Sequence, residues 1–459
     1  LGYSSNNFSQ KFTYDATEQL SFYANGGYYN RGLERPVERE DITGGSKYNT
    51  TYEGYNWGAG AKYKLSKRNV IQFDYSGNNY ASRYKYLIEN SGYLPGQYAL
   101  TKLQKFHDAE LKGIFGFTTN STTVFGADYR REVLRRPDSD LDKSVYTTSA
   151  YGQHEVKLWN HLTGVVGVRY DHHEQTGGRF TPKVAAMYNI GNFNVRATYA
   201  AGFRAPGIDE LYYHMFKKTM GTRATISLGD ENLDPERSNY YSINMEYRTN
   251  RFSASVTGYL NYVKNMVTSK STKFDDLPEA EQNQLREEFP EIGDLSSTKN
   301  LSVKNYFNFE KATVKGFEVN LNGNLFPGFT LAGNYTYAYG RGLNEGGEWQ
   351  NIERSIRHTA TITGNYTHSW SDYTLNLNLN GRLQSKVYYP GDADGNAPGY
   401  GIWNFNTRHT FDGFRNFIIE PGIGIDNIFN KKDNRPLNKN FALYSPGRSV
   451  VISLALRLK

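Results

Sequence analysis

The chain has 459 residues, with 53 Lys and Arg against 46 Asp and Glu, and its formal net charge is +7. This basic excess is small and forms no block, so the composition argues against a nucleic-acid-binding protein. The mean hydropathy is −0.70, and no window contains the roughly 18 consecutive apolar residues that a membrane helix requires. Because the sequence has no cysteine, disulfides and thiolate metal sites are excluded.

Tyrosine, phenylalanine and glycine are abundant, with 38, 26 and 45 residues respectively. Polar and apolar residues alternate in many stretches, and such alternation gives a strand one polar face and one apolar face. Low hydropathy combined with this alternation is typical of a transmembrane β-barrel with a wet inner face. The alternative is a large soluble β-solenoid or propeller, which the lack of a fixed short repeat disfavours.

The predicted strands follow one another along the whole chain. They are expected at 1–14, 18–31, 51–65, 70–86, 101–118, 121–135, 144–157, 159–174, 179–190, 192–203, 237–248, 251–266, 304–325, 328–341, 353–368, 371–389, 401–412, 414–428 and 444–458. Short turns such as 326–328 are expected at the periplasmic end, and long connections such as 204–236 and 267–303 at the extracellular end. About nineteen strands is an odd number, whereas single-chain barrels normally close on an even number. Since strand 1–14 runs toward a short turn, we expect one or three further strands upstream.

Six short motifs occur in an order that resembles one protein family. They are Phe203-Arg204-Ala205-Pro206, Asn232-Leu233-Asp234-Pro235-Glu236, Val314-Lys315-Gly316-Phe317-Glu318, Arg357-His358-Thr359, Asp426-Asn427-Ile428-Phe429-Asn430 and Pro446-Gly447-Arg448. Together they resemble the motifs of TonB-dependent outer-membrane receptors, strongly over 200–459 and by pattern alone before that.

The resemblance implies an all-β, antiparallel transmembrane β-barrel of the 22-stranded receptor type, with about nineteen strands in this chain and three more upstream. It also implies an N-terminal plug domain that fills the lumen and engages the TonB complex of the inner membrane. We therefore expect residues 1–459 to be one transmembrane β-barrel in the bacterial outer membrane, with the plug absent from this chain. Its partners would be outer-membrane lipids, the plug and the TonB complex.

The connection 204–236 contains the candidate ligand-binding residues Arg204, Tyr212, Tyr213 and His214. Imidazole and phenolate groups are protein ligands suited to haem iron. The family's haem receptors carry a histidine on this loop, which implies that His214 is a haem ligand. Asp230-Glu231 stand where that branch has Asn-Pro, and the alternative is an ordinary solvated histidine.

Asp171-His172-His173-Glu174 forms a second candidate site at the end of a predicted strand. Four consecutive polar residues could bind a metal or a chelate, so His172 and His173 are candidate ligand-binding residues. Because adjacent side chains on a strand point to opposite faces, the two histidines share a site only if the turn bends them together. The alternative is a polar strand end without a ligand.

The connection 267–303 has helix-forming composition over 278–289, with Asp275 and Asp276 as candidate caps. Leu285 and Phe289 form an apolar i, i+4 pair. We expect this segment to form either a lid or a docking site for a surface lipoprotein, with a solvated loop helix as the alternative.

The sequence thus predicts a receptor for active uptake of a metal chelate, with haem first, a ferric siderophore second and cobalamin third. No permanently bound cofactor and no nucleic-acid partner is expected. An enzyme is not expected, because the chain has no G-x-S-x-G, P-loop or H-E-x-x-H motif. The alternative from another class is a passive outer-membrane porin.

Overall fold

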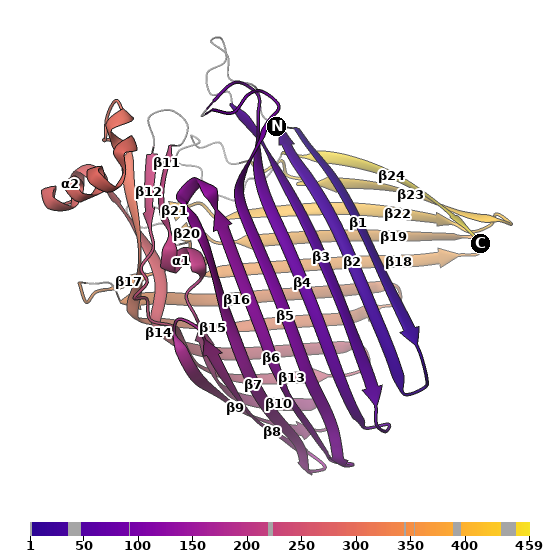
Figure 1. Cartoon of the computed structure of the whole chain (residues 1–459). Coiled ribbons are helices and arrows are strands. Elements are labelled where there is room, and N and C mark those ends of the chain that lie inside the picture. Colours follow the sequence, from indigo (N-terminus) through magenta and orange to yellow (C-terminus); the bar gives the residue numbers. More distant parts are fainter. Residues whose placement is uncertain are drawn as a thin grey trace.

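The computed structural model describes residues 2–34, 47–90, 92–218, 224–343, 346–352, 354–388, 396–432 and 447–459. Within them, nineteen long strands pair in chain order into one curved antiparallel sheet (Figure 1). These strands are β1 (Gly2–Asp15), β2 (Leu20–Glu34), β3 (Tyr48–Lys64), β4 (Asn69–Tyr86), β5 (Tyr98–Thr118), β6 (Ser121–Arg136), β7 (Leu141–Trp159), β8 (Leu162–His173), β9 (Gly177–Ile190), β10 (Phe193–Arg204), β13 (Glu236–Arg248), β14 (Phe252–Lys273), β15 (Leu301–Phe326), β16 (Phe329–Leu343), β18 (His358–Trp370), β19 (Tyr373–Gln384), β22 (Tyr400–Phe411), β23 (Phe417–Asp426) and β24 (Ser449–Leu458). The predicted strand order and number are confirmed.

Shorter elements lie mainly in the long connections. They are α1 (Ile208–Tyr212), β11 (His214–Lys218), β12 (Ala224–Leu228), α2 (Glu279–Glu288), β17 (Trp349–Asn351), β20 (Val387–Tyr388), β21 (Asn396–Ala397) and the 3₁₀ turns η1 (Pro137–Ser139), η2 (Phe274–Asp276) and η3 (Pro290–Asp294). β11, β12 and β17 join the main sheet, which then has 22 strands, while β20 and β21 pair separately. No helix among the described residues is both long and apolar enough to cross a membrane.

The two faces of the sheet differ in polarity, as the alternation predicts. On β13, Ile243 and Met245 point outward and are 54% and 58% exposed, whereas Asn244 and Glu246 point inward. The outward apolar side chains would face lipid, and the inward polar side chains would line a wet lumen. Tight turns connect the strands at one end, and at Gly328 the φ of +80° suits glycine because it lies in the left-handed region. We call the two ends the short-turn end and the long-loop end.

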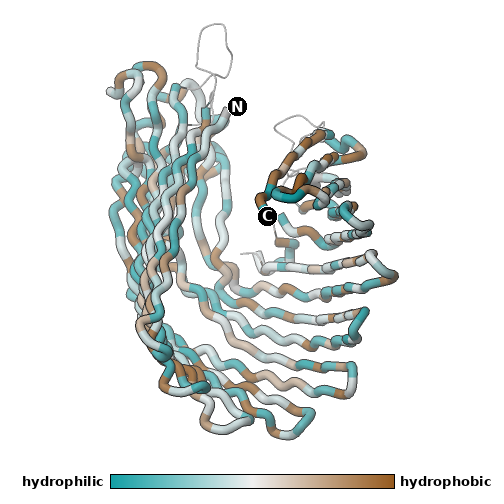
Figure 2. The backbone as a smooth tube through the Cα atoms, turned by 90° about the vertical axis from the view of Figure 1, so that its right-hand side faces the viewer, coloured by the Kyte–Doolittle hydropathy of each residue, from teal (hydrophilic) through white to brown (hydrophobic). Residues whose placement is uncertain are grey.

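The sheet is open between β1 and β24, and Figure 2 shows this opening as the gap between the chain ends. Among the described residues, β1 pairs only with β2, and β24 pairs only with β23. Both edge strands run toward the short-turn end, so antiparallel closure between them requires an odd number of strands. One or three additional strands remain a prediction.

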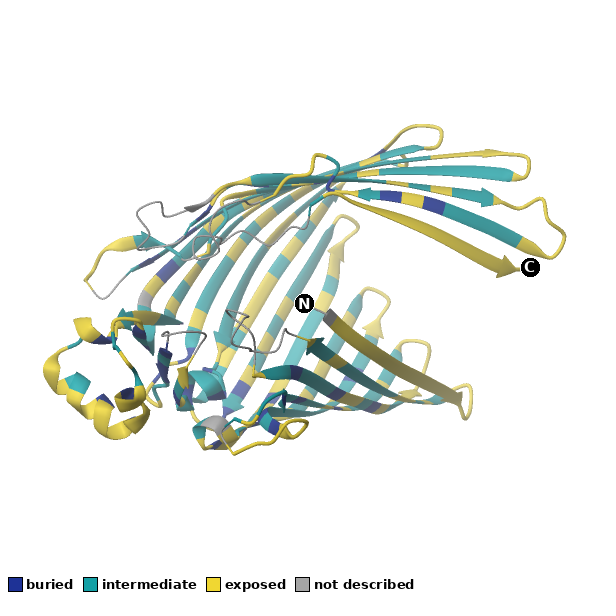
Figure 3. Ribbon diagram, turned by 90° about the horizontal axis from the view of Figure 1, so that it is seen from above, coloured by how far each residue is buried: buried dark blue, intermediate teal, exposed yellow. Residues whose placement is uncertain are grey.

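The two longest predicted loops are more ordered than the sequence indicated, because they pack on each other. β12 pairs in parallel with β15, from Ala224 opposite Leu301 to Leu228 opposite Asn305. We call β11, β12, η2, α2, η3 and the adjoining ends of β14 and β15 the loop module. Its core residues are the most deeply buried apolar cluster in the described chain: Ala224, Ile226, Phe274, Leu285, Phe289, Ile292, Leu301 and Val303. The coiled ribbons at the left of Figure 3 show the helical part of the module.

The helix predicted over 278–289 is confirmed as α2, but its predicted caps are wrong. Pro278 occupies the N-cap, while Asp275 and Asp276 lie in η2. Asp275 instead accepts a hydrogen bond from the Thr298 hydroxyl at 2.6 Å. Because Leu285 and Phe289 are buried in the module core, α2 is not a solvated loop helix. Docking of a lipoprotein on this segment remains a prediction.

Candidate functional site

Arg204 ties together the two ends of the long connection between β10 and β13. Its guanidinium donates to Glu210 Oε2 at 2.9 Å and to Glu236 Oε1 at 2.7 Å. Each carboxylate also accepts a hydrogen bond from the backbone. Glu210 accepts from the Gly207 N–H at 2.7 Å, and Glu236 accepts from the Val267 N–H at 2.8 Å. A planar guanidinium suits two carboxylates at once, since its N–H groups form a rigid fork. The geometry favours a positioning role for Arg204 over direct ligand contact.

Tyr212 and Tyr213 attach this connection to the wall formed by β6 and β7. Tyr213 accepts a hydrogen bond from Arg136 Nη1 at 2.7 Å, and the guanidinium also lies 5.3 Å from the ring centre. The Lys143 ammonium lies 4.7 Å from the ring centre of Tyr212. Burial raises the pKa of Tyr213 above its ordinary value, while the neighbouring Arg136 acts in the opposite direction. These contacts hold Tyr213 against Arg136, and a role for Tyr213 in ligand binding remains a prediction.

His214 begins β11 and packs on the loop module. Its Nε2 lies 3.4 Å from Glu288 Oε2, and its ring stacks on Phe289 with the ring centres 4.4 Å apart. These contacts give the imidazole a structural role between β11 and α2. Haem ligation by His214 remains a prediction.

His172 and His173 lie on opposite faces of β8, as strand geometry predicts. His173 is buried on the lumen side, where its Nδ1 accepts a hydrogen bond from the Gln175 N–H at 3.3 Å. With Asp171 and Arg204, His173 lines a cavity of about 430 Å³. His172 does not line this cavity, and no group of three or more His, Asp or Glu in the described ranges could hold a metal ion. A shared metal site for the two histidines is therefore disfavoured.

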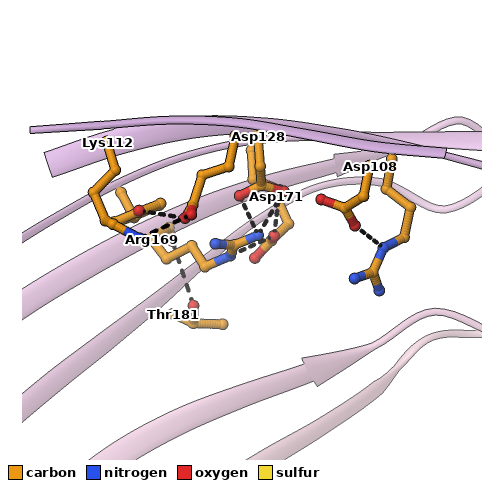
Figure 4. Close-up of polar contacts among 10 residues, drawn as sticks. Asp108, Lys112, Asp128, Arg169, Asp171 and Thr181 are labelled. Atoms are coloured by element: carbon orange, nitrogen blue, oxygen red, sulfur yellow. Dashed lines mark hydrogen bonds and ion pairs between the residues drawn. The ribbon is translucent and has the colours of Figure 1, made fainter. Parts of the chain in front are cut away.

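Charged side chains form a paired network on the inner wall across β5 to β8 (Figure 4). Arg169 lies between Asp128 and Asp171, with nitrogen–oxygen distances of 2.9 and 2.7 Å. A second pair joins Arg130 to Asp108 at 2.7 Å. Each of these guanidinium groups has a carboxylate partner, so the network gives the lumen a polar wall with little unpaired charge. The network could not be predicted from the sequence, because it depends on the registers of four neighbouring strands.

A further cavity of about 400 Å³ lies at the long-loop end, between the ends of β3 to β5 and β11. We call it the mouth pocket, and it is lined by four tyrosines, four basic residues and three hydroxyl residues: Tyr48, Tyr52, Tyr80, Tyr84, Lys102, Arg136, Lys217, Lys218, Thr50, Ser82 and Thr101. Tyr48 stacks on Tyr84 with ring centres 3.7 Å apart. Among the described residues, no acidic side chain is part of this lining. Aromatic rings and cations together suit an anionic ligand that has flat rings of its own.

Sequence analysis missed the mouth pocket because its parts are far apart in the chain. Lys217 and Lys218 belong to β11, which lies inside a connection that was expected to be an irregular loop. The tyrosines lie on the inner face at the long-loop ends of β3 and β4. Tyr48 lies before the strand that was expected at 51–65, and only the fold of the connection brings the lysines beside the tyrosines.

The comparisons with known proteins agree with this architecture. Residues 1–428 match the family model described as TonB dependent receptor-like, beta-barrel. The chain is 24% identical over 315 residues to the ferric enterobactin receptor PirA of Pseudomonas aeruginosa. This alignment covers 63% of this chain and 38% of that protein. It is also 21% identical over 286 residues to the vitamin B12 transporter BtuB of Vibrio cholerae, covering 59% and 41% respectively. The chain thus spans less than half the length of these curated relatives.

Two solved structures show the same fold. The siderophore receptor PirA from Pseudomonas aeruginosa aligns with all of this chain and 71% of its own, at a TM-score of 0.68 and 17% identity. The FrpB iron transporter from Neisseria meningitidis covers 99% of this chain and 71% of its own, at a TM-score of 0.72 and 13% identity. At such low identity, these likenesses support the fold and not a shared ligand.

Proposed function

Because the chain belongs to the TonB-dependent receptor-like β-barrel family, we propose that it forms the barrel of a receptor for active uptake of a ferric siderophore. The bacterial outer membrane is its location, as for the receptors and transporters that it resembles. The ligand would be an anionic ferric chelate with aromatic iron-binding groups. The plug and the TonB complex are proposed partners, as expected for this family.

The observation that carries the proposal is the lining of the mouth pocket. Lys217 and Lys218 reach it from β11, opposite the tyrosines of β3 and β4. Cations attract the negative charge of the chelate, and the tyrosine rings offer flat surfaces for its aromatic groups. The site lies at the long-loop end, which is the end expected to face the medium.

Haem, which the sequence favoured first, receives less support than the siderophore alternative. The relatives reported above are named for ferric enterobactin and vitamin B12. In addition, the His214 ring packs on Phe289, and the Tyr213 hydroxyl accepts a hydrogen bond from Arg136. His214, the residue expected to ligate haem iron, is thus engaged within the protein.

Equilibrium titration of the full-length receptor with a ferric catecholate, followed by quenching of protein fluorescence, tests the proposal. Reversing two charges in the double variant Lys217→Glu, Lys218→Glu should weaken binding by about tenfold or more. The matched control Lys67→Glu, Lys157→Glu reverses two charges near the short turns and should bind like the wild type. Unchanged affinity in the pocket variant would overturn the proposal.

A haemin Soret shift that disappears in His214→Ala would restore the haem interpretation.

A further inference from the structure

The outward face of the sheet has an uneven charge distribution across β9, β10 and β13 to β16. Charged side chains on this face occur only toward the long-loop end, and all those in the described strands are basic. They are Arg237, Lys264, Lys311, Lys315 and Arg341. Their outward direction follows from strand alternation, because Arg237 shares a face with exposed Tyr241 and Lys264 with exposed Tyr262. The opposite, inward face of the same strands carries both Glu246 and Glu318.

The same face contains an apolar groove of about 640 Å³. Its floor is one cross-strand row in which three of four residues are small: Ala186, Ala197, Ile243 and Gly258. The next row toward the long-loop end is bulkier and contains Val184, Tyr199, Tyr241 and Leu260. Because the small residues lie beside larger neighbours, the row forms a hollow in a lipid-facing wall.

Two of the basic residues, Arg237 and Lys264, lie above this groove at a distance that matches a lipid molecule. Lys315 is the cross-strand partner of Leu260, so it lies beside the groove. Arg237 and Lys264 face each other three rows beyond the hollow. At about 6.7 Å for each two-residue step, they lie roughly 20 Å along the strands from it. Strand tilt near 40° reduces this to about 15 Å of depth, which is half of a hydrocarbon core.

We propose that this surface binds a phosphorylated glycolipid of the outer leaflet, with its phosphates at Arg237 and Lys264 and an acyl chain in the groove. Lysine and arginine at a membrane interface attract anionic headgroups, and the basic cluster is opposite in charge to the phosphates. Two cations in directly paired positions on β13 and β14 repel each other unless an anion lies between them. A second copy of the chain is a poorer occupant, because symmetric contact would bring the two basic clusters together.

The test is native mass spectrometry of the full-length receptor extracted from outer membranes in mild detergent. The wild type should retain phosphorylated glycolipid. The double variant Arg237→Glu, Lys264→Glu should retain at least about tenfold less. The matched control Lys183→Glu, Arg196→Glu makes the same charge change on the inward face of β9 and β10 and should retain the wild-type amount. Resistance of each variant to unfolding in detergent at room temperature, seen as a compact band on gels, checks that the barrel is folded.

A second variant tests the groove separately from the charges. Gly258→Phe fills the hollow without striking protein atoms, because an added Cβ at Gly258 has nothing within 4 Å. It should reduce retention of glycolipid while the cations remain. Competition with added lipids distinguishes a site for phosphorylated glycolipid from a site for any anionic lipid. Lipid A should displace the bound molecule more effectively than phosphatidylglycerol. Equal retention in the wild type and in both the charge and groove variants would overturn the proposal, as would a dimer in place of bound lipid.

Discussion

At the scale of single residues, Arg204 explains the sequence motif around it. The guanidinium joins Glu210 and Glu236, so the spacing of these three residues serves loop geometry. Arg204→Lys keeps the charge but cannot reach both carboxylates in the same way. We expect faster proteolysis within 205–235 and weaker ligand binding, while the barrel stays folded. Limited proteolysis followed by mass spectrometry measures the rate and position of cleavage. Arg196→Lys, on the same strand, is the matched control, because the Arg196 guanidinium donates a hydrogen bond to the Met187 sulfur instead of joining two carboxylates. Equal cleavage of both variants would contradict the positioning role.

At the scale of elements, the loop module has an apolar core separate from the barrel wall. Leu285 is 3% exposed within that core. Leu285→Ala should destabilise the module by about 2–5 kcal/mol, because it removes a buried side chain and leaves a cavity. Hydrogen exchange should therefore accelerate in β11, β12 and α2 while β5 to β8 stay protected. Asn283→Ala, at an exposed position on the same helix, should leave exchange unchanged. If hydrogen exchange in the module of Leu285→Ala stays as slow as in the wild type, α2 does not stabilise the paired strands β11 and β12.

At the scale of the whole molecule, the open edge between β1 and β24 leads to a prediction about the full-length receptor. If an odd number of strands separates these edges, cysteines at Phe12 and Ile452 should form no disulfide with each other, since bridging requires Cα atoms within about 7 Å. Ile423 is the direct partner of Ile452, so a cysteine pair there is the positive control. The chain has no native cysteine to interfere. A Phe12–Ile452 crosslink at the control yield would place β1 against β24.

The barrel was predictable from sequence, whereas the site was predictable only in part. Alternation with period two fixes strand positions locally, as in Ile243 to Met245, so the strand order and number agreed with the structure. The parallel pairing of β12 with β15 was not predictable, because it joins two segments separated by two strands and a helix. For the same reason, the lysines of β11 could not be placed beside the tyrosines of the mouth pocket. His214 was visible as a residue, but its stacking on Phe289 depends on that long-range packing.

The most direct test of the proposed function is uptake of radioactive iron supplied as a ferric catecholate. Cells would carry the full-length receptor as their sole high-affinity route for the chelate. We predict accumulation that a protonophore abolishes and that the double variant Lys217→Glu, Lys218→Glu reduces several-fold at low chelate concentration. Entry that continues with the protonophore and is the same in both receptors would contradict active uptake through the mouth pocket and would favour a passive porin.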